Sequence, residues 1–313
     1  MAADQVAGWR GDVRLTTAAR PSPLQFEQMQ QNRELMRGEE ARKALVDFLP
    51  FLIKYHPIDK CRESFVELRA LLADVWPEGA PEPTDFGTFE RWRPCGDLVT
   101  WDTWGACRGS ASDLRGFSCG FWQLLHGMTM GIGDDDAQPF VRAVGDFMMH
   151  LFGCHNCGEH FQKAALSPKS GALVQTGKDL VLWMWRIHNI VNNFTAPWSD
   201  PAFPKQQWPG PGLCWQCSKN GGRPDKDGRV QWIDDQVHLF LVDFYGYVLE
   251  GGQVRHISGS EGKQVSAFHA LLRLAHVTVV SRSFPGPGRD RLFPAAALRR
   301  VLARWRRRHG ARS

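Results

Sequence analysis

The stretch that decides the fold runs from Phe152 to Asn193 and opens with Cys154-His155-Asn156-Cys157, followed by His160-Phe161. It closes on Trp185-Arg186-Ile187-His188-Asn189-Ile190-Val191-Asn192. A Cys-x-x-Cys pair holds two sulfurs within reach of each other, so it can cycle between dithiol and disulfide. The opening of the stretch therefore predicts a redox pair or a metal-binding pair.

The second half of the stretch has the periodicity of a helix. Val181, Trp185, His188 and Asn192 follow a spacing of i, i+4, i+7 and i+11, which places them on one helical face. An ordinary core stripe is aliphatic, whereas this face combines an indole, an imidazole and an amide. Such a combination suits a flat heteroaromatic ligand that needs both stacking and hydrogen bonds.

Composition describes a globular protein. The 313 residues are 43% hydrophobic, enough for one large or two modest domains with a real core. The net charge of +5 is mild and partly local, because the last eighteen residues hold seven arginines and no acid. The body is then near neutral, so charge does not argue for a nucleic-acid partner.

The eight cysteines are even in number and visibly paired along the chain. Their order suggests Cys154 with Cys157, Cys214 with Cys217, and Cys107 with Cys119. Cys61 and Cys95 are left over, and either pair or stay buried as free thiols. This usage favours an oxidising compartment, although a reduced cytosolic metalloprotein also fits. No transmembrane run exists, and the N-terminus shows no apolar signal core.

The hydrophobic pattern predicts an all-α protein, because no alternation typical of strands is sustained. Residues 1–22 form a loose leader, and residues 24–76 have helical stripes in which Pro50 kinks a helix or starts a new one. Asp134 to Asp136 are expected to cap one later helix and Asp179 another. A last amphipathic helix is expected over 233–249, with an irregular appendage beyond Gly251.

Two chemistries compete for the Cys-x-x-Cys pairs. Zinc is one, but the gap between the two pairs is long, and the first lies among amphipathic helices rather than in tight polar turns. A flavin-linked thiol centre is the other. His155 and His160 could lower a thiol pKa if charged. Trp, His, Asn and Lys side chains supply stacking surfaces, hydrogen-bond donors and a phosphate-binding cation for the flavin. Each side chain alone suits a structural role, so their joint occurrence favours the redox interpretation.

At these residues the chain resembles the Erv/Alr flavin-linked sulfhydryl oxidases, and among them the quiescin sulfhydryl oxidases. The similarity runs from about Cys107 to Cys217 with matching order and spacing. Its motifs are Arg115-Gly116-Phe117-Ser118-Cys119, Trp122, His126, Cys154-His155-Asn156-Cys157 with His160-Phe161, Trp185 to Asn192, Phe203-Pro204-Lys205, Trp208, and Cys214 with Cys217.

The resemblance implies a helical bundle that binds FAD. In that family the second cysteine of the active pair, here Cys157, lies against the flavin, and the first, here Cys154, exchanges with incoming thiols. It implies a structural disulfide Cys107–Cys119 and an auxiliary disulfide Cys214–Cys217. The FAD contacts that it implies are Arg115, Trp122, His126, Asn156, His160, Trp185, His188, Asn189, Val191, Asn192, Lys205 and Trp208.

The same resemblance implies thiol oxidation by dioxygen, giving a disulfide and hydrogen peroxide. Small dithiols or reduced proteins are the expected substrates, and the lumen of the endoplasmic reticulum or Golgi, or the exterior, is the expected location. The alternative is a non-enzymatic helical interaction module stabilised by zinc.

The expected domains are a degenerate helical Erv-like domain without flavin at 23–106, the oxidase domain at 107–218, a C-terminal helix at 219–250 and a basic, largely irregular tail at 251–313. The chain shows no thioredoxin-like Cys-x-x-Cys before Cys61, where quiescin-type oxidases carry one. The tail has a helical face opposite its arginines and could lie on an anionic membrane, although a solvated tail is the favoured interpretation.

Overall fold

The computed structural model describes residues 33–92, 95, 107–111, 114–226 and 229–257, and most of them are helical. The expected leader at 1–22 and the arginine-rich residues of the tail lie outside the described residues. The helices are η1 (Arg33–Met36), α4 (Glu39–Tyr55), α5 (Asp59–Val75), α6 (Phe86–Arg91), α7 (Gly116–Thr129), α8 (Asp134–His150), α9 (His155–Ala165), η4 (Gly171–Leu173), α10 (Gly177–Thr195), η5 (Ala196–Trp198), η6 (Trp215–Cys217) and α11 (Asp234–Tyr245). A short antiparallel hairpin, β1 (Tyr247–Glu250) and β2 (Gln253–His256), follows α11.

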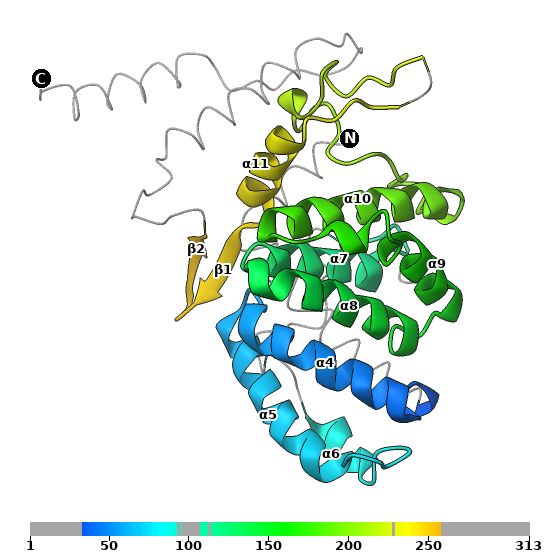
Figure 1. The fold of residues 1–313 in the computed structure, drawn as a ribbon, viewed down its shortest axis with the longest axis vertical. Coiled ribbons are helices and arrows are strands. Elements are labelled where there is room, and N and C mark those ends of the chain that lie inside the picture. Colours follow the sequence, from blue (N-terminus) through cyan, green and yellow to red (C-terminus); the bar gives the residue numbers. More distant parts are fainter. Residues whose placement is uncertain (1–32, 93–94, 96–106, 112–113, 227–228, 258–313) are drawn as a thin grey trace, which may run out of the picture. The chain divides into compact units, whose positions relative to one another are not determined.

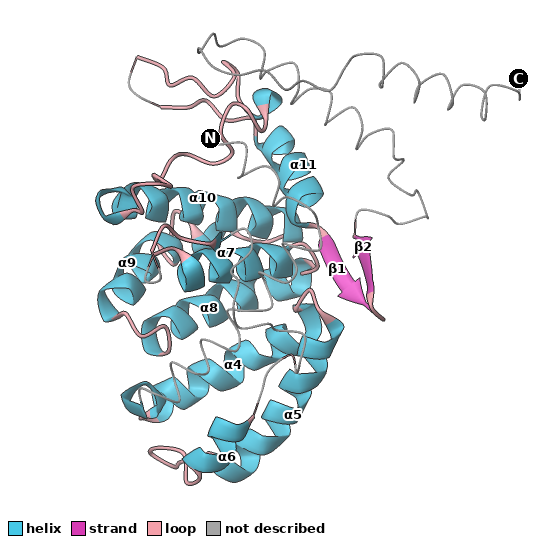
Figure 2. Cartoon of the chain, turned by 180° about the vertical axis from the view of Figure 1, so that it is seen from behind, coloured by secondary structure: helices cyan, strands magenta, loops and turns pink. Residues whose placement is uncertain are grey.

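The bundle that carries the candidate site consists of α7, α8, α9 and α10, which pack on one another (Figure 1). Helix α4 packs on α8, and α5 packs on α4. Viewed from behind, helices are the main elements of the described chain, loops connect them, and the hairpin is the one described sheet (Figure 2). The prediction of a mainly helical fold is therefore confirmed.

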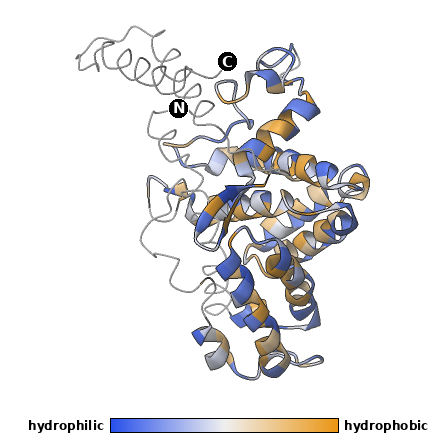
Figure 3. Ribbon diagram, turned by 90° about the vertical axis from the view of Figure 1, so that its left-hand side faces the viewer, coloured by the Kyte–Doolittle hydropathy of each residue, from blue (hydrophilic) through white to orange (hydrophobic). Residues whose placement is uncertain are grey.

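One continuous apolar core joins the expected N-terminal helical domain to the expected oxidase domain. Phe48 of α4 lies 4.7 Å from Phe147 of α8 between ring centroids, and both rings are almost fully buried. The helices show hydrophobic residues along one side and hydrophilic residues along the other (Figure 3). The amphipathic stripes expected over 24–76 thus pack against the bundle, and no break in packing separates the two expected domains among the described residues.

A second, smaller cluster forms where α10 meets α11. It contains Val181 and Trp185 of α10, the disulfide of Cys214 and Cys217, and Leu241 of α11. This cluster attaches the proline-rich segment after α10 and the last helix to the bundle.

Helix α4 runs continuously through Pro50, so of the two outcomes expected there, a kink or a new helix, the new helix does not occur. Two expectations about helix caps are wrong. Helix α8 is preceded by Gly133 with no side-chain cap, and Asp134 instead accepts a hydrogen bond from the backbone N–H of Gly177 at 2.7 Å. The cap of α10 is Thr176 rather than Asp179. The two residues form a reciprocal capping box.

The C-terminal expectation also needs correction. The helix expected over 233–249 ends at Tyr245, and 247–256 form the hairpin instead. The turn residues Gly251 and Gly252 have φ values of 56° and 75°, as a two-residue hairpin turn of the primed kind requires. The appendage expected beyond Gly251 therefore begins with an ordered strand. Among the described helices, none has the length and apolarity needed to cross a membrane.

Candidate active site

The Cys154–Cys157 pair forms a disulfide at the N-terminus of α9. Cys154 is the N-cap residue, and its Sγ accepts the backbone N–H of Cys157 at 3.3 Å. A helix N-terminus favours negative charge, so a thiolate at Cys154 is stabilised there. Cys157 is exposed and Cys154 is half-buried. The disulfide is thus presented at the surface, as thiol exchange requires.

Gly158 fixes how closely α9 approaches the end of α8. A Cβ atom at this position would lie 2.6 Å from the carbonyl oxygen of Met148, closer than real Cβ contacts come. Only glycine permits this approach. Gly158 therefore allows the first turn of α9, which carries the disulfide, to pack closely against the end of α8.

The two histidines near the cysteines have different surroundings. His155 is exposed, with its Nε2 3.2 Å from a carboxylate oxygen of Glu159. His160 is also exposed, and its ring lies 4.0 Å from that of Phe194 on α10. An effect of either imidazole on a thiol pKa therefore stays a prediction.

A stacked array of rings lies between α7, α10 and α11. The ring of Trp122 lies parallel to that of His188, with centroids 4.1 Å apart and an interplanar angle of 1°. His126 Nε2 and His188 Nδ1 are 3.0 Å apart, which is a hydrogen bond. On its other side His126 stacks on Tyr245 at 4.4 Å and 9°. Three predicted site residues are therefore in direct contact.

Both imidazoles of the array are held neutral. Burial lowers the pKa of His126 to about 3. The pKa of His188 is well below its usual value because of burial first, and then of nearby His126 and Lys205. His126 Nδ1 is buried and has no hydrogen-bond partner among the described residues. An unsatisfied buried nitrogen is costly unless a ligand or water binds it, so this atom is a candidate contact for a ligand or a water.

Two of the predicted α10 residues clamp the segment after the helix. Trp185 Nε1 donates to the carbonyl oxygen of Trp208 at 2.6 Å, and Asn189 Nδ2 donates to the same oxygen at 2.8 Å. Asn189 Oδ1 accepts the backbone N–H of Trp208 at 2.7 Å. Both side chains thus fix the position of the backbone at Trp208.

A pair of partly buried cations lies beside the array. Burial, followed by the charge of Arg115, lowers the pKa of Lys205, and burial lowers the pKa of Arg115. Arg115 lies over the ring of Phe203 at 4.1 Å. In the described part of the chain, no carboxylate lies within ion-pair distance of Lys205. Two neighbouring cations of this kind have the charge that binding of an anion such as a phosphate requires.

Asn192 adds a second unsatisfied atom. Its Nδ2 donates to the carbonyl of Gln206 at 3.5 Å, whereas its buried Oδ1 has no partner among the described residues. Of the remaining predicted contacts, Asn156 is exposed and Val191 packs against the core at the edge of the bundle. Tyr245 of the stacked array was missed, because no pattern in the sequence links it to His126.

All eight cysteines lie in the described part of the chain, and all are in disulfides. Cys107–Cys119 and Cys214–Cys217 are paired, as the resemblance implied. Cys61–Cys95 is also paired, which decides the question the sequence left open. In this state neither Cys-x-x-Cys pair offers a thiolate to zinc, so the covalent structure does not favour the zinc alternative.

Comparisons with known proteins agree with this arrangement. Residues 119–209 match the Erv1 / Alr family. The chain is 36% identical over 219 residues to Sulfhydryl oxidase 1 of Oryza sativa subsp. japonica, covering 66% of this chain and 42% of that protein. It is 31% identical over 224 residues to Sulfhydryl oxidase 1 of Arabidopsis thaliana, covering 68% and 41%. The chain thus spans less than half the length of these curated relatives.

The structure is similar to the solved Sulfhydryl Oxidase Fragment of Human QSOX1. The TM-score is 0.59 at 28% sequence identity, and the match covers 73% of this chain and 93% of that one. It therefore extends well beyond residues 119–209 and takes in helices on both sides of the matched family region. The bundle around Cys154–Cys157 thus lies in a region that matches the Erv1 / Alr family, and the chain is similar to the sulfhydryl oxidases over about two thirds of its length.

Proposed function

We propose that this chain is a flavin-linked thiol oxidase that forms disulfides and reduces dioxygen to hydrogen peroxide. The observation that carries the proposal is the exposed Cys154–Cys157 disulfide at the N-terminus of α9, in the region similar to the Erv1/Alr family. Small dithiols or reduced proteins would be the substrates. Four disulfides in one chain fit the lumen of the secretory pathway or the exterior as its location.

The residues present fit FAD. The stacked pair of Trp122 and His188 offers a flat aromatic surface, and Arg115 with Lys205 offers charge for a diphosphate. Because the buried Oδ1 of Asn192 has no partner among the described residues, it would accept a hydrogen bond from the ligand. When bound, FAD would supply a two-electron acceptor that can pass those electrons to dioxygen.

The cysteines would carry out the exchange with the substrate. A substrate thiolate attacks Sγ of Cys154, the Cys154–Cys157 bond breaks, and Cys157 leaves as a thiolate. A second substrate thiolate then attacks the substrate sulfur of this mixed disulfide, which releases the substrate disulfide and leaves Cys154 as a thiolate. The N-terminus of α9 stabilises that leaving group. The substrate has lost two electrons, and the cysteine pair has gained them.

The test is purification of the full chain, its flavin absorbance, and its oxygen consumption with dithiothreitol. Cys157→Ser should lower thiol oxidation by about two orders of magnitude or more while flavin stays bound, because other residues form the proposed pocket. The matched control is Cys214→Ser with Cys217→Ser, which removes a Cys-x-x-Cys disulfide of the same spacing and should keep most activity toward small dithiols.

Normal dithiothreitol oxidation by Cys157→Ser would contradict the proposed exchange. A nearly inactive control would instead mean that Cys214 and Cys217 relay electrons. A colourless protein with stoichiometric zinc would support the interaction module.

A further inference from the structure

A buried disulfide lies apart from the candidate active site, in the helices that precede the bundle. It joins Cys61 in the first turn of α5 to Cys95, 34 residues later, and both residues are fully buried. The proposed thiol exchange at Cys154–Cys157 makes no use of it. Its surroundings contain one polar group that packing alone does not explain.

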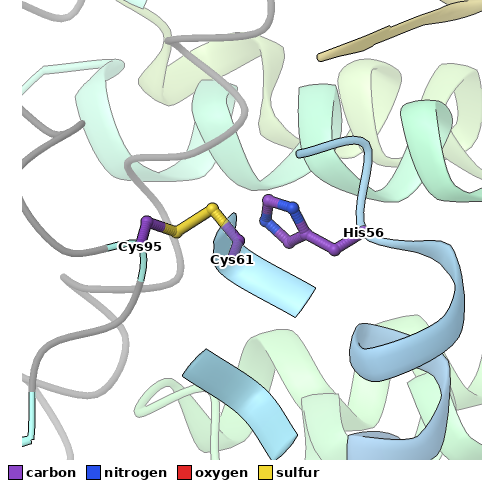
Figure 4. Close-up of side chains that lie close together, drawn as sticks. All are labelled: His56, Cys61 and Cys95. Atoms are coloured by element: carbon purple, nitrogen blue, oxygen red, sulfur yellow. A yellow bond between two sulfur atoms is a disulfide. The ribbon is translucent and has the colours of Figure 1, made fainter. Parts of the chain in front are cut away.

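That group is the imidazole of His56, in the turn between α4 and α5. A ring nitrogen of His56 and the sulfurs of Cys61 and Cys95 all lie within 4.8 Å of one another. Figure 4 shows the ring beside the disulfide and turned toward it. The residue is fully buried, and its Nε2 has no hydrogen-bond partner among the described residues.

The other ring nitrogen determines where the proton of His56 lies. The backbone N–H of Ile58 donates to Nδ1 at 3.1 Å, so Nδ1 carries a lone pair and no proton. Burial, followed by the charge of Arg62, lowers the pKa of His56 to about 3, so the ring is neutral. A neutral imidazole carries one proton, which must then be on Nε2.

This tautomer argues against a metal ion at the cluster. A metal would need the lone pair of Nε2, and the proton would have to move to Nδ1, where the N–H of Ile58 already points. What remains is an N–H donor, free among the described residues, on a ring that lies beside two sulfurs. A disulfide sulfur accepts hydrogen bonds poorly, whereas a thiolate accepts them strongly.

We propose that Cys61–Cys95 is a second redox site and that His56 Nε2–H stabilises its reduced form. The reductant is a dithiol. Its thiolate attacks one sulfur, the Cys61–Cys95 bond breaks, and its second thiol resolves the mixed disulfide. The dithiol becomes a cyclic disulfide, the pair gains two electrons, and one cysteine retained as a thiolate accepts the Nε2–H. His56 is a positioning residue for this couple, because it acts on the sulfurs through a hydrogen bond.

The test is the equilibrium of this couple in the purified full chain. Because both sulfurs are buried and exchange is slow, the protein is equilibrated without oxygen in buffers of reduced and oxidised dithiothreitol. Differential alkylation and peptide mass spectrometry then give the reduced fraction of each cysteine pair. Cys154–Cys157 in the same sample is the internal control.

Two variants separate the donor from the rest of the ring. His56→Asn keeps an acceptor for the N–H of Ile58 and loses the donor at Nε2, whereas His56→Gln keeps an N–H₂ near the Nε2 position. His56→Asn should lower the equilibrium constant for reduction of Cys61–Cys95 about tenfold, or ~30 mV for a two-electron couple. His56→Gln should stay close to the wild type, and Cys154–Cys157 should not move in either variant.

Equal shifts in both variants, or no shift in His56→Asn at wild-type helix content by circular dichroism, would overturn the proposal. Stoichiometric binding of zinc to the reduced protein that is lost in Cys61→Ser would also overturn it, because the cluster would then be a metal site. The oxidase activity does not enter this measurement, so its result is independent of the proposed function.

Discussion

Asn189 uses both polar atoms of its side chain on the backbone of one residue, Trp208. Asn189→Ala should therefore lower the free energy of unfolding by about 1–3 kcal/mol, since it removes two hydrogen bonds to the backbone of Trp208. It should also reduce flavin retention, because Lys205 lies on the segment that is released. Urea unfolding and the flavin-to-protein ratio measure the two effects. The control is Asn193→Ala, an exposed asparagine of the same helix. A loss of equal size there would contradict the clamp.

His126 gives a prediction about pH. Its pKa is about 3 in the folded protein and about 6.5 in an unfolded chain. As the pH falls below 6.5, the unfolded state takes up a proton that the folded state does not, so stability falls. In His126→Gln, the difference in unfolding free energy between pH 7.5 and pH 5 should be smaller by about 2 kcal/mol.

The remaining pH dependence in that variant should come from the other histidines whose pKa values burial lowers, His56, His188 and His238. Urea unfolding at the two pH values is the measurement. An unchanged difference between them would mean that His126 is charged or solvated in the folded protein.

At the scale of elements, the hairpin is the part that the sequence interpretation missed. Its strands have four residues each, too short for alternation to be distinguished from one more turn of an amphipathic helix. A usable signal existed, because Gly251-Gly252 separates two short runs by two residues, the spacing of a tight hairpin. The long helices were predictable, since their apolar stripes extend over several turns.

Side-chain roles within the site were less predictable. The sequence placed Trp122, His126 and His188 in one site, and their rings are indeed in contact. It gave no means of seeing that Asn189 is occupied by a backbone segment, or that Tyr245 completes the stack, because both contacts depend on how the chain returns after α10. The predicted helix caps were wrong for a related reason. Asp134 caps no helix of its own but accepts the backbone N–H of Gly177 across the bundle, a tertiary contact that the sequence does not reveal.

Truncation tests the hairpin as an element. Ending the chain after Ile257 should leave stability and flavin content unchanged. Ending it after Gly251 removes β2 together with the bond from Ile257 N–H to the carbonyl of Gly246 at 2.8 Å. The loss should be on the order of 1–2 kcal/mol, from the cross-strand pairs. Thermal unfolding of the two proteins compares them, and equal midpoints would show that the hairpin does not stabilise the helices beside it.

At the scale of the whole molecule, the four disulfides are expected to differ in their contribution to stability. Cys61–Cys95 closes a span of 34 residues, whereas Cys214–Cys217 closes one of three. Chain entropy then predicts that Cys61→Ala with Cys95→Ala costs about 4 kcal/mol and that Cys214→Ala with Cys217→Ala costs about 1.6 kcal/mol. Guanidinium unfolding gives both values. If the shorter span cost more, packing around Cys217 would outweigh the entropy of the unfolded chain.

The hairpin also bridges distant parts of the chain. Leu249 N–H donates to the carbonyl of Pro57 at 2.8 Å, Arg62 pairs with Glu250 at 3.0 Å, and Gly251 N–H donates to Asp59 at 2.6 Å. The last bond joins residues 192 positions apart. On a ribosome adding about 5–20 residues per second, roughly 10 to 40 s separate the two ends of that bond. During that interval of synthesis, the turn after α4 lacks its contacts with the hairpin. Chaperones can bind the exposed turn in this time.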